Sequence, residues 1–151
     1  MTTIPAYINF STALARQARY AGRLSVAMLP RLADCLAARE GELHIELEIR
    51  AERGGPPHLV GHIGGGVTLI CQRCMRAYLQ PVSIAVDLRP VTSEAEEARL
   101  LRDSDPYLLI DDRLPLHEVI EDEVLLALPM VPYCEHPDCA GGGQPLGADL
   151  N

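Results

Sequence analysis

The chain has 151 residues, of which 48% are hydrophobic and 23% charged, and its formal net charge is −8. This length and composition indicate one globular domain with its own core, and they exclude a wholly disordered chain. No apolar run reaches the length of a membrane-spanning helix, and the first residues lack a signal-peptide pattern. We therefore expect a cytoplasmic protein without a membrane partner.

The charge is divided unevenly along the chain. Residues 1–39 contain five Arg and one acid, a net charge of +4, whereas residues 40–151 contain eight Arg and twenty acids, a net charge of −12. Non-specific binding to nucleic acid depends on neutralising phosphates, so the acidic part is a poor nucleic-acid binder. The basic N-terminal segment is the candidate for a local contact with RNA or a partner, through Arg16, Arg19 and Arg23.

Two helices are expected near the N-terminus. The Ala- and Arg-rich run over residues 12–21 contains no Pro or Gly and predicts a short helix that Gly22 ends. A second helix is predicted over residues 29–38, with Pro30 in its first turn. This helix contains a lone cysteine, Cys35, which we expect to be a small buried residue.

From residue 42 onwards the pattern changes to that of strands. Apolar residues alternate with polar ones over residues 42–49, which predicts a half-buried strand. A second strand is predicted from residue 58 to residue 71, with a bulge or bend at Gly64–Gly66, and a third within residues 75–91. The short turns between these runs predict antiparallel hairpins.

The last part of the chain contains the clearest helical pattern. Residues 92–106 predict a solvated loop or short helix, and residues 107–110 a short strand. Residues 114–128 predict a helix with a broad apolar face, whose acids Glu118, Glu121 and Asp122 are expected to face water. We therefore predict an α+β domain over residues 1–139, with a curved antiparallel sheet, N-terminal helices and a C-terminal helix, and a flexible tail over residues 140–151.

Four of the five cysteines form two close pairs. Cys71 and Cys74 have the spacing CxxC, Cys134 and Cys139 have the spacing CxxxxC, and 59 residues separate the pairs. Zn²⁺ prefers four Cys or His ligands in a tetrahedron, supplied as pairs at such spacings. The pattern predicts a zinc site that clamps the hairpin end to the segment after the last helix. Because no coordination position is left open, this zinc would be structural.

Other interpretations of the cysteines stay open. A thiol redox pair at Cys71 and Cys74 would need to begin a helix, whereas the flanking residues predict strands. His136 could replace a cysteine ligand, or the thiols could remain without metal. Gly64–Gly66 lacks the Lys and Ser/Thr of a phosphate loop, and no catalytic arrangement is indicated. We expect neither catalytic residues nor a small-molecule substrate.

Three segments together are specific enough to suggest a family. They are Ala15 to Gly22, the segment LICQRC at residues 69–74, and the segment EDEVLLALPMVP at residues 121–132, which leads into Cys134. In this combination the chain resembles the YceD family, the large ribosomal RNA subunit accumulation proteins of bacteria and plastids. The resemblance covers roughly residues 9–139.

The resemblance implies a non-enzymatic factor for ribosome biogenesis. Its partner would be ribosomal RNA or a large-subunit assembly component, contacted directly or indirectly. In similar proteins the positions of Cys71, Cys74, Cys134 and Cys139 form a Cys-rich set, in which the residue at position 134 is sometimes His. Two alternatives remain: a thiol redox protein that uses Cys71 and Cys74, and a zinc-stabilised protein-interaction module without RNA contact.

Overall fold

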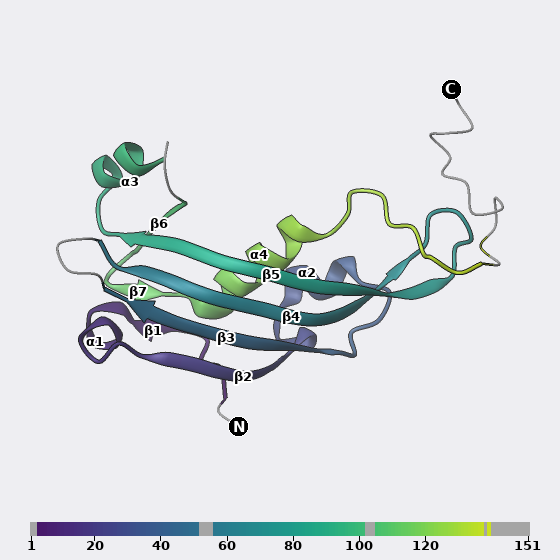
Figure 1. The fold of residues 1–151 in the computed structure, drawn as a ribbon, viewed down its shortest axis with the longest axis horizontal. Coiled ribbons are helices and arrows are strands. Elements are labelled where there is room, and N and C mark those ends of the chain that lie inside the picture. The colour runs from purple at the N-terminus through teal and green to yellow at the C-terminus, as the bar shows by residue number, and fades with distance from the viewer. Residues whose placement is uncertain (1–2, 52–55, 102–104, 138, 140–151) are drawn as a thin grey trace.

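The computed structural model describes residues 3–51, 56–101, 105–137 and 139; the predicted tail, residues 140–151, lies outside them. The described chain forms a five-stranded sheet, a two-stranded sheet and short helices, so the predicted α+β class is confirmed (Figure 1). The strands are β1 (Ile8–Asn9), β2 (Arg19–Ser25), β3 (Glu42–Arg50), β4 (His58–Ile70), β5 (Ala77–Val91), β6 (Pro106–Leu108) and β7 (Arg113–Leu114). The helices are α1 (Phe10–Ala15), η1 (Val26–Met28, a 3₁₀ turn), α2 (Pro30–Cys35), α3 (Glu94–Leu100) and α4 (Leu116–Ala127).

The large sheet has the strand order β2-β3-β4-β5-β6. Strands β2 to β5 are antiparallel neighbours, as the hairpin pattern predicted for β3 to β5 alone. The register of β4 with β5 is unbroken from Leu59 opposite Leu88 to Ile70 opposite Ala77, so the bulge predicted at Gly64–Gly66 is not found. These two long strands carry the chain from the body of the domain to the cysteine pair at residues 71–74.

One strand pair differs from the predicted antiparallel sheet. β6 joins β5 in parallel, with Arg89 opposite Pro106 and Val91 opposite Leu108. A parallel pair needs a crossover connection, and here the segment that contains α3 provides it. The sheet is therefore mixed.

The helix predicted over residues 12–21 is wrong in its second half. α1 ends at Ala15, Gln17 turns the chain with a φ of 46°, and β2 follows. In β2 the buried Tyr20 and Leu24 point to the core, and β2 pairs with β3 along its whole length. Pairing with a neighbouring strand outweighs the helix propensity of an Ala- and Arg-rich run.

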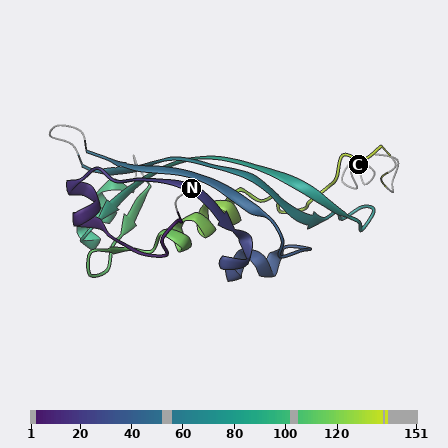
Figure 2. The same ribbon diagram turned by 90° about the horizontal axis from the view of Figure 1, so that it is seen from below.

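α1, α2 and α4 lie on one face of the large sheet (Figure 2), whereas α3, which has no buried residue, lies beyond the edge of the sheet (Figure 1). The apolar residues of β3 that face them, such as Leu43 and Ile45, are buried, and the alternate residues of the strand lie on the open face. α4 packs against this inner face through Leu116, Val119, Ile120 and Val124. No helix among the described residues is both long and apolar enough to cross a membrane.

Glu121 joins α4 to α2, although the helical pattern predicted that it faces water. Only 4% of its surface is exposed. One carboxylate oxygen accepts a hydrogen bond from the backbone N–H of Leu32, 3.0 Å away, in the first turn of α2. The other accepts from Arg31 Nε at 2.9 Å and lies 2.8 Å from Arg31 Nη2. Because α2 has no side-chain cap of its own, Glu121 supplies one from another helix.

We expect Glu121→Ala to lower the free energy of unfolding by about 2 kcal/mol, because it leaves the buried N–H of Leu32 without its acceptor, while Arg31 keeps its pair with Asp122. The matched control is Asp122→Ala, which removes an exposed ion pair with the same Arg31 and should cost about 0.5 kcal/mol. Chemical denaturation of both variants measures the difference. Equal losses would contradict the capping role.

Candidate metal centre

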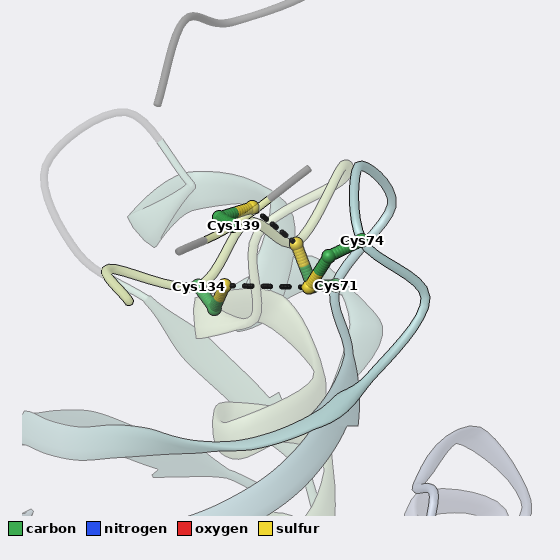
Figure 3. A group of neighbouring side chains, drawn as sticks. All are labelled: Cys71, Cys74, Cys134 and Cys139. Atoms are coloured by element: carbon green, nitrogen blue, oxygen red, sulfur yellow. Dashed lines mark hydrogen bonds between the residues drawn. The ribbon is translucent and has the colours of Figure 1, made fainter. Parts of the chain in front are cut away.

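The two cysteine pairs, far apart in the sequence, lie together in the structure. Cys71 follows the end of β4, and Cys74 lies in the turn that leads to β5. Cys134 and Cys139 lie in the segment that follows α4. The sulfur atoms of all four lie within 4.8 Å of one another, and Figure 3 shows them gathered from the two segments. The sequence prediction that the pairs come together is therefore confirmed.

The spacing of the sulfur atoms fits a tetrahedral metal site. The Sγ atoms of Cys71 and Cys139 are 3.7 Å apart, and those of Cys74 and Cys134 are 3.6 Å apart. Zinc–sulfur bonds of about 2.3 Å in a regular tetrahedron place the sulfur atoms about 3.8 Å apart. All four cysteines are free thiols. The residues present therefore fit a zinc ion held by four cysteines.

The turn at residues 71–74 is ordered by its own backbone. Cys71 N–H donates to Arg76 O at 2.9 Å, and Met75 N–H donates to Cys71 O at 2.8 Å. Met75 has a φ of 60°, which reverses the chain after Cys74. The backbone N–H of Arg73 points to the sulfur of Cys71, 3.4 Å away, and such N–H groups orient and stabilise a thiolate ligand. A backbone hydrogen bond from Gln72 to Pro132 joins the turn to the second cysteine segment.

Arg73 connects the two cysteine segments through its side chain. Its Nη2 donates to Cys134 O at 3.2 Å, and its guanidinium lies 4.8 Å from the ring centre of Tyr133. Its Nε and Nη1 are buried without a hydrogen-bond partner among the described residues. This buried positive charge beside the sulfur atoms offsets part of the negative charge of thiolates. The sequence prediction missed this role, although an Arg between the two cysteines of a pair was a visible signal.

The protein environment favours ionisation unequally across the cluster. Burial opposes the Cys71 thiolate, but backbone N–H groups, first that of Cys134, favour it more, and the pKa of Cys71 falls to about 5. Hydrogen bonds from Arg76 lower the pKa of Cys74. Burial and the neighbouring sulfur atoms raise the pKa of Cys139 to about 12. Four thiolates this close repel one another, and a bound cation would balance their charge.

A comparison with protein families identifies a family model that includes the cysteine cluster. A family model described as large ribosomal RNA subunit accumulation protein YceD matches residues 59–151, more than half of the chain. The chain belongs to the YceD family. The matched region begins in β4 and includes both cysteine pairs and α4. No solved structure matches the chain.

In this YceD family member, the arginines predicted to contact RNA or a partner lie apart from the cysteine cluster. Arg16 follows the last residue of α1, whereas Arg19 lies on β2, so these two residues do not share one helix as expected. Arg23 also lies on β2, and the side chains of all three are exposed. On β3, Glu48 lies 3.6 Å from Arg19 and Glu42 lies 3.6 Å from Arg23. These acids reduce the positive charge that the segment can offer to RNA.

His136 and Cys35 also lie apart from the sulfur cluster. The sulfur cluster of the described residues consists of the four cysteines without His136, whose side chain is exposed. Cys35, at the last position of α2, is exposed, so the prediction of a buried residue was wrong. The short α2 turns Leu32 and Ala33 to the core and leaves Cys35 on its outer side. Cys35 is therefore a natural control for the cluster cysteines.

We expect the purified protein to contain about one equivalent of zinc, and each of Cys71→Ser, Cys74→Ser, Cys134→Ser and Cys139→Ser to reduce it well below half. Structural zinc binding is coupled to folding, so these variants should also lose several kcal/mol of unfolding free energy. Elemental analysis after purification without chelators measures the metal. The control, Cys35→Ser, should keep both the metal and the stability. Retention of zinc by all four cluster variants would contradict the site.

Zinc affinity should rise with pH near neutrality, because zinc displaces protons from thiols. At pH 7 Cys71, with a pKa of about 5, has already lost its proton, whereas Cys139, with a pKa of about 12, still has one. Binding should therefore release about one to three protons, fewer than one from every cysteine. Titration calorimetry in buffers with different ionisation enthalpies counts them. Release of a proton from every cysteine, or of none, would contradict this distribution of charge.

Proposed function

We propose that this YceD family member is a non-catalytic factor that holds one structural zinc ion and supports large-subunit ribosomal RNA accumulation in the cytoplasm by binding a partner. The observation that supports this proposal most strongly is the group of four cysteine sulfur atoms at tetrahedral spacing in a chain of this family. The family description supports the link to ribosomal RNA. The cluster supports the proposal that zinc holds together the turn between β4 and β5 and the segment after α4.

The burial of the cluster supports a structural role for the metal. Cys71 is fully buried, and Cys134 and Cys139 are nearly so. Catalytic zinc sites keep a position open for water or substrate, whereas four cysteine ligands fill the tetrahedron. We infer that the metal fixes the relative position of the two segments and that recognition takes place on the surface that they form.

A thiol redox protein is the second candidate, because the lowered pKa of Cys71 is typical of reactive cysteines. Two features speak against it. The Cys71 side chain is enclosed, whereas thiol exchange needs an accessible sulfur. The pair Cys71 and Cys74 lies in a turn between strands and not at the start of a helix. A redox protein would lose thiol exchange in Cys74→Ser without loss of fold, whereas the zinc centre should lose stability.

In this proposal, direct contact with RNA would be made by Arg16, Arg19 and Arg23. Contact of these residues with RNA remains a prediction, weakened by the acids beside two of them. If they bind phosphates, affinity for large-subunit ribosomal RNA falls steeply with salt, and neutralising all three reduces the slope. If the slope does not change, the link to ribosomal RNA passes through a protein partner.

In cells that lack the native gene, Cys74→Ser and Cys139→Ser should fail to restore the ratio of large-subunit to small-subunit ribosomal RNA, because they disrupt the zinc centre. Cys35→Ser should restore it fully. Quantification of both RNAs at equal protein levels measures the effect. Full restoration by both cluster variants would show that the centre is not needed for the function.

A further inference from the structure

β5 has a long edge that no described strand covers. On one side it pairs with β4 from Ala77 to Leu88. On the other side β6 pairs only with Arg89 to Val91. Among the described residues, the stretch from Ala77 to Leu88 therefore presents a free edge, next to the metal centre at its beginning.

The backbone groups on this edge can be assigned from its paired end. Arg89 N–H donates to Asp105 O, and Leu109 N–H donates to Val91 O, so the odd-numbered residues of β5 direct their backbone groups away from β4. This alternation of an antiparallel ladder continues along the strand. The free edge then presents backbone donors and acceptors at Leu79, Ser83 and Ala85. Pro81, which has no N–H to lose, fits the same pattern.

The two edges of the large sheet differ in their side chains. On the open face, β2 has Arg19 and Arg23, and charges of this kind discourage unwanted strand pairing. The exposed residues of β5 before Asp87 carry no charge; they are Ala77, Leu79, Pro81, Ser83 and Ala85. The edge of β5 therefore lacks the protection that the edge of β2 has.

Apolar surface and a hollow adjoin the free edge. Leu79 is 70% exposed, and Met75, just before the strand, is 65% exposed. A hollow of about 360 Å³ lies between the first half of β5 and the segment that follows Pro132. The residues that line it are Tyr78, Leu79, Gln80, Pro81, Tyr133, Glu135 and His136. Cys134 lies between Tyr133 and Glu135, so the metal centre would hold this side of the hollow next to the edge of β5.

We propose that this free edge of β5 binds an extended, basic segment of another protein, which adds to the sheet as a strand and places an apolar side chain in the hollow. Strand addition uses backbone hydrogen bonds for affinity and side-chain pockets for specificity. The net charge of −8, with exposed acids at Glu135 beside the hollow and Asp87 at the far end of the edge, favours a basic partner. An uncharged edge offers few contacts to phosphates, so RNA is not the expected occupant. The proposal rests on the proposed function and gives the binding factor its kind of partner.

The test is photo-crosslinking of the full-length protein in cells, with a photoreactive phenylalanine in place of Leu79. The matched control places the same group at Tyr7, which is also exposed but lies away from β5. We expect a crosslink from position 79, and not from position 7, to an extended basic segment, identified by mass spectrometry.

Ser83→Pro tests whether the partner pairs with the backbone. It removes an N–H from the free edge and leaves the bonds to β4 in place, so the crosslink at position 79 should fall about ten-fold. Ser83→Ala loses the same hydroxyl but keeps the N–H, and should stay within about two-fold. Ala85→Pro, with Ala85→Val as its control, repeats the test two residues along the edge, which covers the case that Ser83→Pro does not fold.

The outcomes separate this proposal from the function on which it rests. A crosslink to RNA or to a second copy of the chain, no crosslink, or a crosslink that neither proline variant reduces overturns the strand addition. These results leave the proposed function intact if the cysteine variants still fail to restore large-subunit ribosomal RNA. Full restoration by the cysteine variants overturns the proposed function, whatever position 79 contacts.

Discussion

The group of four cysteine sulfur atoms is the constraint on which the arrangement at this end of the molecule depends. It joins the turn between β4 and β5 to the segment after α4 and so closes a loop across 59 intervening residues. Closing such a loop costs conformational entropy, and metal–thiolate bonds are strong enough to offset that cost. Arg73 reinforces this connection, because it lies in the first cysteine pair and contacts the second segment by a hydrogen bond and by stacking on Tyr133.

A second constraint holds the first half of α4. Glu121 caps α2 and pairs with Arg31, and His117 Nε2 lies 2.8 Å from Ile4 O in the N-terminal segment. α4 is thus fixed to the helical layer near its start, and the metal would fix the segment that leaves its end. Between these points α4 covers the inner face of β5, so the outer face and the free edge of that strand remain for a partner.

Much of this architecture could be predicted from the sequence, and the failures have physical causes. Alternation predicted β3, and cysteine spacing predicted the cluster, because both are local patterns with few competing structures. The run at residues 12–21 was misassigned because its helix propensity is overridden by pairing with β3, which a local pattern cannot show. The helical pattern predicts that Glu121 faces water, because its partner, the uncapped start of α2, is distant in sequence. The parallel β6 likewise depends on the path of a crossover.

Membership of the YceD family links the chain to large-subunit ribosomal RNA accumulation, and our proposal is that a metal-held binding surface is the means. The central claim is that one zinc ion lies between the four cysteines. Zinc-edge X-ray absorption spectroscopy of the purified full-length protein tests it most directly. The account predicts a single shell of four sulfur atoms at about 2.3 Å from the metal. A shell that contains nitrogen or oxygen ligands in place of sulfur, or the absence of bound zinc, would contradict it.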